Sequence, residues 1–152
     1  MHITFVCTGN TCRSPMAEAI ARRTIAERGM TGVTVSSAGV AARKEAPASE
    51  GARRVAAEAG LSLDGHRSTS LTEEVVAASA LVLCMDGFHL WRTVELGGEG
   101  WCRLLSEMAG ETGEVEDPFG GPDETYRATF SELSRLVRRV FDRIADGEGG
   151  VR

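Results

Sequence analysis

The chain has 152 residues, of which 42% are hydrophobic and 26% are charged, and this composition predicts one globular domain rather than a disordered protein. The formal net charge of −5 argues against a general nucleic-acid-binding protein, because such proteins carry an excess of basic residues. Apolar runs are far shorter than the ~20 residues that span a membrane, and the N-terminus lacks the pattern of a secretory signal, so we expect a cytoplasmic protein with no membrane partner.

Hydrophobic periodicity predicts strands that alternate with helices, and therefore an α/β domain built on a parallel sheet. Ser14 and Pro15 are typical of a helix start, with Ser14 as the cap and Pro15 in the first turn. The expected elements in chain order are a strand at 2–6, a helix from 14 that ends at Gly29, a strand at 33–37, a helix at 49–59, a short helix from 72, a strand at 79–85, a helix at 88–96, a strand at 101–105 and a helix from 124.

The sequence contains no internal repeat or linker, so we expect residues 1–146 to form a single domain. Residues 147–152 are rich in glycine and are expected to form a flexible C-terminal tail. The last helix has a single apolar stripe, made of Tyr126, Phe130, Leu133, Val137, Val140, Phe141 and Ile144.

Cysteine and histidine are few, and their spacing is not that of a zinc site or of a disulfide-rich scaffold, so we expect no metal. These residues are Cys7, Cys12, Cys84, Cys102, His2, His66 and His89. A free cysteine usually serves as a small, buried hydrophobic residue. The residues around Cys7 do not fit that role.

A loop with the form C-x5-R-S connects the first strand to the first helix, at the strand end where parallel sheets bind their ligands. Such a loop can wrap its backbone N–H groups around one tetrahedral anion, towards which the helix directs its positive end. Gly9 and Asn10 tolerate the left-handed backbone angles of a tight cradle, and Arg13 offers a planar fork for phosphoryl oxygens. The expected phosphate-binding residues are Thr8, Gly9, Asn10, Thr11, Cys12, Arg13 and Ser14.

Cys7 lies at the mouth of this cradle, and the donors that hold phosphate are expected to lower its pKa and make it a nucleophile. Ser14 could donate to its sulfur. Phosphoryl transfer also needs a general acid, and Asp117 is the best candidate because Pro118 restricts its backbone to extended angles. The alternative is a buried cysteine in a glycine turn beside an unrelated arginine.

The segment from Cys7 to Glu18 (CTGNTCRSPMAE), together with Asp117-Pro118, resembles the two signatures of the low-molecular-weight protein phosphatase family. The resemblance implies a three-layer α/β sandwich with a four-stranded parallel sheet and a phosphate-binding loop after the first strand. It also implies that Cys7 is the nucleophile, Arg13 binds phosphate and Asp117 is the general acid. The reaction would proceed through phosphocysteine without a cofactor and release inorganic phosphate from phosphorylated proteins. A monomer is the default for so small an enzyme.

Two further features follow from the resemblance. Asn10, Ser37 and His66 match the residues whose hydrogen bonds shape the loop in this family. Cys12 lies five residues after Cys7, and the resemblance suggests a reversible disulfide between the two that protects the nucleophile from irreversible oxidation.

The substrate depends on the residues that line the pocket. Tyrosine phosphatases of this family typically carry a bulky aliphatic residue in place of Thr11 and often have two aromatic residues after the Asp-Pro pair, whereas this chain has Phe119 and Gly120. The pattern resembles the bacterial protein-arginine phosphatases, because threonine leaves room and hydrogen-bonding capacity beside a guanidinium group. A tyrosine phosphatase is the main alternative.

Other functions are less well supported by the residues. A thioredoxin-coupled arsenate reductase needs two further cysteines in a relay, but Trp91 stands where a second thiol is expected after Cys84. A phosphate-binding module without activity would not need Asp117. A redox protein that uses Cys7 and Cys12 would exchange thiols without releasing phosphate.

Overall fold

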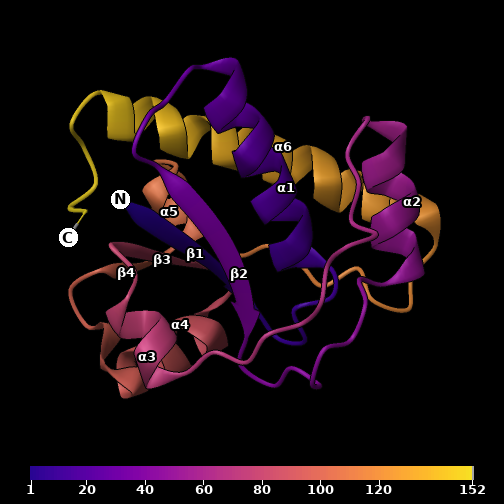
Figure 1. Ribbon diagram of the computed structural model, residues 1–152, viewed down its shortest axis with the longest axis horizontal. Helices are drawn as coiled ribbons and strands as arrows, with labels where there is room; N and C mark the ends of the chain where they lie inside the picture. Colours follow the sequence, from indigo (N-terminus) through magenta and orange to yellow (C-terminus); the bar gives the residue numbers. More distant parts are fainter. Residues whose placement is uncertain (152) are drawn as a thin grey trace.

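The computed structural model describes residues 1–151 and contains one four-stranded parallel sheet, which confirms the expected fold class. Its strands are β1 (His2–Cys7), β2 (Thr34–Gly39), β3 (Leu81–Cys84) and β4 (Cys102–Leu104), in the order β2-β1-β3-β4. β1 pairs along its length with β2 and through Ile3 to Val6 with β3, and β3 pairs with β4; all three pairings are parallel. The carboxyl ends of the strands therefore meet at one edge of the sheet, where β1 leads into the loop that begins at Cys7 (Figure 1).

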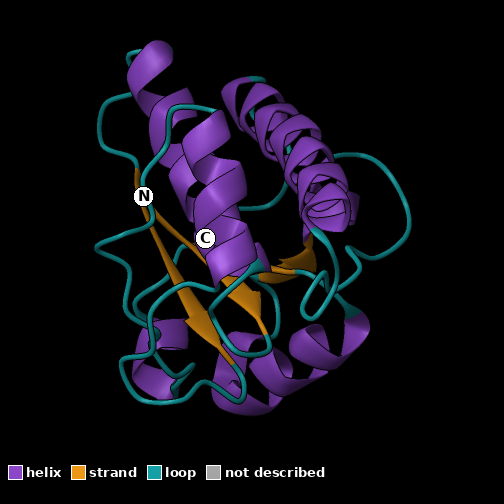
Figure 2. Cartoon of the chain, turned by 90° about the vertical axis from the view of Figure 1, so that its right-hand side faces the viewer, coloured by secondary structure: helices purple, strands orange, loops and turns teal. Residues whose placement is uncertain are grey.

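Helices cover both faces of the sheet and give three layers, as Figures 1 and 2 show. One face is covered by α1 (Arg13–Glu27), α2 (Glu50–Glu58), α5 (Leu105–Met108) and the long helix α6 (Asp123–Ala145). The other face is covered by α3 (Glu73–Ala77) and α4 (Gly87–Thr93), and a short π-helical turn, η1 (Val94–Gly98), continues α4.

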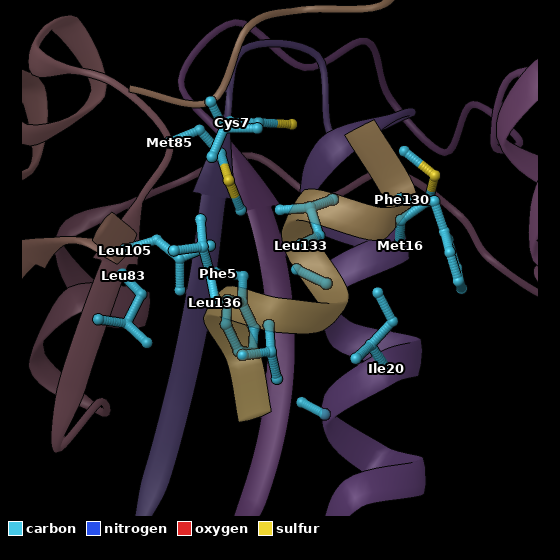
Figure 3. Packing of buried hydrophobic residues seen from close by; sticks show 14 of the residues in the cluster. Phe5, Cys7, Met16, Ile20, Leu83, Met85, Leu105, Phe130, Leu133 and Leu136 are labelled. Atoms are coloured by element: carbon cyan, nitrogen blue, oxygen red, sulfur yellow. The ribbon is translucent and has the colours of Figure 1, made fainter. Parts of the chain in front are cut away.

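Alternation along β1 divides the interior into two cores. Ile3 and Phe5 point to the face covered by α1 and α6, whereas Val6 points to the face covered by α3. The larger core is built where the apolar stripe of α6 packs against α1 and the sheet, and Figure 3 shows Leu133 and Leu136 between these elements. This packing holds β1 and α1, the two elements that flank the loop, in a fixed relation.

The elements expected from the sequence are present, with shifts of one to three residues at their ends. The predicted N-cap of the first helix, Ser14, is wrong. The first helix begins at Arg13, one residue before the expected cap, and Cys12 is its N-cap without a side-chain hydrogen bond. Ser14 therefore lies inside the first turn, and its hydroxyl contacts Cys7 and Asn10 instead of capping the helix. The short helix α5 was not expected.

The chain after α6 ends in a turn and a short coil. Val151 packs against the larger core, and Arg152 lies outside the described residues. Both the single domain at 1–146 and the flexible tail at 147–152 stay predictions. Within residues 1–151, no helix is both long enough and apolar enough to cross a membrane.

We predict that Leu133→Ala lowers the free energy of unfolding by about 2–5 kcal/mol, because the side chain is fully buried between α6 and the sheet and its removal leaves a cavity. Urea denaturation would measure the change. Arg139→Ala, on the exposed side of the same helix, is the matched control. A loss below about 1 kcal/mol for Leu133→Ala would mean that this core is not packed as described.

Candidate active site

A pocket of about 560 Å³ opens at the carboxyl edge of the sheet, above the loop at 7–14. The loop forms one side of the pocket, the segment at 41–49 and the start of α2 form another, and Asp117 and Phe119 complete it. The residues that line it are Cys7, Thr8, Gly9, Thr11, Cys12, Arg13, Ala41, Arg43, Ala46, Pro47, Ala48, Ser49, Glu50, Arg53, Asp117 and Phe119. Residues far apart in the sequence thus meet around the expected phosphate-binding loop.

Asn10 is the centre of the hydrogen bonds that shape this loop. Its backbone is left-handed, with φ 55°, as expected for a tight cradle, whereas Gly9 does not adopt a positive φ. The Asn10 side-chain amide donates to Ser14 at 2.8 Å and to Ser37 at 2.9 Å, and its Oδ1 accepts from the Thr69 backbone N–H at 2.9 Å. Its backbone carbonyl accepts from His66 Nε2 at 2.7 Å. The structure thus brings together the three residues expected to shape the loop.

Two residues that the sequence analysis did not single out support the same network. Glu18 is buried, and its carboxylate accepts a hydrogen bond from the Ser37 hydroxyl at 2.6 Å. Gly39 ends β2 directly beneath the loop, where an added Cβ would lie 2.5 Å from the Thr8 carbonyl oxygen. Only glycine fits there, because the atoms it would meet belong to the backbone.

The wall at 41–49 is attached to the loop at its two ends. The Ala41 backbone N–H donates to the Thr8 carbonyl, and the Ser49 backbone N–H donates to the Thr11 carbonyl, both at 2.9 Å. Between these anchors, the Ala46 backbone N–H donates to the Ser68 hydroxyl at 2.8 Å. The wall therefore keeps a fixed position relative to the phosphate-binding loop.

Cys7 is buried at the end of β1, and Figure 3 shows it at the margin of the larger core. Its sulfur lies 2.9 Å from the Ser14 hydroxyl. The Ser14 hydroxyl accepts from the Asn10 amide, and its own proton faces two acceptors, the Cys7 sulfur and the Ala38 carbonyl oxygen at 3.5 Å. The sulfur is the nearer of the two, so the hydroxyl donates to it. Burial raises the pKa of the Cys7 thiol, and this outweighs the hydrogen bonds from Ser14 and the charge of Arg13, which lower it. The expectation of a lowered pKa was therefore wrong, because it counted donors and left out desolvation.

Arg13 is almost fully buried and is held by acceptors on several sides. Its Nη1 donates to the Val115 carbonyl at 2.8 Å and lies 3.5 Å from the Asp86 carboxylate. Its Nη2 lies 3.4 Å from the Thr8 hydroxyl and 3.7 Å from the Asp117 carboxylate. Asp86, which caps α4, was not identified from the sequence.

Asp117 reaches the pocket from the long loop before α6. Its side chain is 49% exposed, one of its carboxylate oxygens pairs with Arg13, and the other accepts from the Phe119 backbone N–H at 3.0 Å. Phe119 is 71% exposed, and Gly120 turns the chain with φ 82°. The expected general acid and the expected phosphate-binding arginine are thus in contact.

His89 is a further buried side chain beside the loop that sequence reasoning missed. Its Nε2 lies 2.8 Å from the Thr8 hydroxyl, and its Nδ1 lies 3.2 Å from the Asp86 backbone nitrogen. Burial lowers the pKa of His89 to about 4, and the positive charge of Arg13 acts in the same direction against the charge of Asp86. The ring is therefore neutral near pH 7. In the sequence, His89 lies in an apolar stretch that predicts a helix, and nothing there indicates that it lies beside the loop.

All four cysteines are buried and none forms a disulfide. Cys12 lines the pocket, with its sulfur 3.1 Å from the Ser49 hydroxyl and 3.5 Å from the Tyr126 hydroxyl. Burial raises the pKa of Cys84 to about 12, and neither Cys84 nor Cys102 lines the pocket. Within residues 1–151, no cluster of three or more His, Cys, Asp or Glu side chains is arranged to hold a metal ion.

Comparison with known proteins gives consistent results. The model of the low molecular weight phosphotyrosine protein phosphatase family matches residues 2–148. A protein-arginine-phosphatase of Geobacillus stearothermophilus is 40% identical over 145 residues, which is 93% of this chain and 95% of that protein. The low molecular weight protein-tyrosine-phosphatase PtpB of Staphylococcus haemolyticus is 38% identical over 149 residues, which is 92% of this chain and 97% of that protein.

Solved structures are similar as well. A mutant of YwlE arginine phosphatase with a phosphorylated active site serine has a TM-score of 0.91 and 38% sequence identity, and the match covers 95% of this chain and 96% of that one. The likeness extends over nearly the whole of both chains.

We predict that Ser14→Ala raises the pKa of Cys7, because the hydroxyl donates to the sulfur and stabilises the thiolate more than the thiol. The pH dependence of Cys7 alkylation by iodoacetamide, followed by mass spectrometry, should shift by about one to two units towards alkaline pH. Ser70→Ala, at an exposed position, should leave the profile in place. An unchanged profile for Ser14→Ala would show that its hydroxyl does not act on the sulfur.

Proposed function

Since this chain belongs to the low molecular weight phosphotyrosine protein phosphatase family and is a cysteine-dependent protein phosphatase, we propose that it hydrolyses phosphoarginine in proteins. The observation that supports phosphoarginine as the substrate is the composition of the pocket. Thr11 lines it where a bulky aliphatic residue would favour a phenyl ring, and the wall at 41–49 contributes the small side chains of Ala46, Pro47 and Ala48 beside it. Thr11 and these small side chains leave space for a guanidinium group, and the Thr11 hydroxyl can form a hydrogen bond with it. The wall offers no aromatic side chain against which a phenyl ring could stack.

In the first step, the Cys7 thiol passes its proton to a phosphoryl oxygen of the substrate, and the resulting thiolate attacks phosphorus while Arg13 and the loop N–H groups hold the oxygens of the phosphoryl group. The S–P bond forms as the P–N bond breaks. Asp117 donates a proton to the departing nitrogen, which leaves as part of an arginine side chain. Supporting this, the carboxylate of Asp117 lies 3.7 Å from the Arg13 guanidinium, at the open side of the pocket. Ser14 stabilises the sulfur when it carries charge.

In the second step, the carboxylate of Asp117 takes a proton from water, which attacks the phosphocysteine and releases inorganic phosphate. The S–P bond breaks, and the thiolate of Cys7 returns to the hydrogen bond of Ser14. A similar structure of a mutant arginine phosphatase carries a phosphorylated active site serine, which supports an intermediate on residue 7 here. Cys7, Arg13 and Asp117 are the proposed catalytic residues, and no resident metal or cofactor is needed.

A tyrosine phosphatase is the second candidate. Phe119 is exposed at the mouth of the pocket and offers one aromatic face, and a relative at 38% identity is named a protein-tyrosine-phosphatase. An arsenate reductase has no such support, because Cys84 and Cys102 are buried away from the pocket. A binding module without activity leaves the position of Asp117 beside Arg13 unexplained.

We further propose that Cys12 forms a reversible disulfide with Cys7 when a peroxide oxidises one of the two thiols to a sulfenic acid, which then condenses with the other thiol and releases water. Both cysteines line the pocket in the same loop, and the Cys12 sulfur is held only by the hydroxyls around it. The protein acts on phosphorylated proteins, and we propose that it does so as a monomer in the cytoplasm.

We predict that the parent enzyme hydrolyses a phosphoarginine peptide with a higher kcat/KM than the matching phosphotyrosine peptide. Thr11→Ile should shift this preference towards phosphotyrosine by about tenfold or more, because it replaces a hydroxyl with apolar bulk in the pocket. Phosphate release from both peptides measures the ratio. Thr31→Ile, at an exposed position outside the pocket, is the matched control. Faster hydrolysis of phosphotyrosine by the parent enzyme would refute the substrate but not the family.

We predict that Asp117→Asn lowers kcat on the phosphopeptides by about 10²–10⁴-fold, since the amide cannot donate a proton to the leaving group. The loss should be much smaller on p-nitrophenyl phosphate, whose leaving group departs readily as an anion. Steady-state kinetics on both substrates provide the comparison, and Glu116→Gln is the neighbouring exposed control. Equal losses on both substrates would argue against a general acid.

A further inference from the structure

His89 is fully buried and lies between two groups that contact Arg13. One is Thr8, whose hydroxyl is 2.8 Å from His89 Nε2 and 3.4 Å from Arg13 Nη2. The other is Asp86, whose carboxylate accepts the His89 backbone N–H at 3.1 Å and lies 3.5 Å from Arg13 Nη1. The steps proposed above make no use of this ring, although a polar side chain buried so completely needs a reason for its position.

The contacts of His89 determine which ring nitrogen carries the proton. Nδ1 lies 3.2 Å from the Asp86 backbone nitrogen, which can only donate, and 3.3 Å from Asp86 Oδ1. That oxygen accepts the His89 backbone N–H and makes no hydrogen bond with the ring, so Nδ1 accepts from the Asp86 backbone N–H. Because burial also keeps the ring neutral, the single ring proton is on Nε2. His89 therefore donates to Thr8, and the Thr8 hydroxyl oxygen accepts.

With both neighbours donating to its oxygen, the Thr8 hydroxyl still has its own proton to donate. Its hydroxyl oxygen has two lone pairs, and the two donors that approach it are His89 Nε2 and Arg13 Nη2. Its own proton has no acceptor among residues 1–151. Thr8 lines the pocket together with Cys7 and Arg13. The proton is therefore available to an acceptor inside the pocket, and a phosphoryl oxygen held by Arg13 is such an acceptor.

We propose that His89 is a positioning residue that turns the Thr8 hydroxyl into a donor for a phosphoryl oxygen in the pocket. Thr8 thereby adds a side-chain hydrogen bond to those of the loop N–H groups and Arg13. The ring also accepts the Asp86 backbone N–H, and the His89 backbone N–H donates to the Asp86 carboxylate, so this one residue contacts two of the groups that surround the guanidinium. The inference rests on the proposed function only in that the pocket binds a phosphoryl group, whether from arginine or from tyrosine.

Variants of Thr8 test the donor. Thr8→Val keeps the shape of the side chain and removes the hydroxyl, and Thr8→Ser keeps the hydroxyl. We expect Thr8→Val to lower both kcat/KM on p-nitrophenyl phosphate and the affinity for inorganic phosphate, measured by calorimetry, by about 10- to 100-fold, as for a lost hydrogen bond to a charged group. Thr8→Ser should stay within about threefold of the parent. Parent values for Thr8→Val in both measurements would overturn the proposal.

A double-mutant cycle tests whether His89 acts through Thr8. His89→Met removes the ring donor, and His89→Gln keeps a donor near the position of Nε2. We expect His89→Met to lower phosphate affinity in the parent but to cause little further loss in the Thr8→Val background, and His89→Gln to restore part of the affinity. Equal losses in both backgrounds would show that the ring has only a structural role.

The cycle also separates a folding defect from a loss of positioning. Urea denaturation of each variant reports any loss of stability from changing a buried ring, whereas a dependence on the Thr8 hydroxyl appears only in phosphate affinity and kcat/KM. Calorimetry with inorganic phosphate does not depend on turnover. The outcome is therefore independent of the comparison between phosphoarginine and phosphotyrosine, which tests the substrate.

Discussion

The pocket depends on the hydrogen bonds of one side chain, the carboxamide of Asn10. It lies at the turn of the loop, where the backbone is left-handed, and it connects Ser14, Ser37 and the backbone of Thr69 to that turn. Because these bonds connect the turn to the first turn of α1, to β2 and to the segment before α3, the loop cannot open without losing several of them together. The curvature that directs backbone N–H groups at an anion is thus maintained by hydrogen bonds within the protein itself.

The electrostatics of the site follow from the same enclosure. Arg13 is buried with two partners on Nη1 and two on Nη2, and these contacts fix the direction of its guanidinium. Burial disfavours the thiolate form of Cys7 and raises its pKa, whereas the hydrogen bond from Ser14 favours the thiolate and lowers the pKa. The site therefore combines a fixed positive charge with a buried nucleophile whose thiolate the Ser14 hydroxyl stabilises.

Local patterns in the sequence predict the parts of this molecule that depend on neighbours in the chain. The strand at 2–6, the loop from Cys7 and the helix after it follow from short-range periodicity and from residue types with known backbone preferences. Asp86 and His89 could not be found in this way, because their roles arise only when α4 folds beside the loop. The pKa of Cys7 was misjudged for a similar reason, since donors can be read from the sequence and burial cannot.

The attachment of the wall at 41–49 has an evolutionary consequence. Its backbone is tied at Ala41 and Ser49 to the loop, while the side chains between these points face the pocket without taking part in the loop's hydrogen bonds. Substitutions at Ala46 or Pro47 can therefore alter what is recognised and leave the reactive groups undisturbed, whereas Ala48 is buried in the larger core. Related chains can diversify in their targets by drift along this short stretch while the chemistry is inherited unchanged.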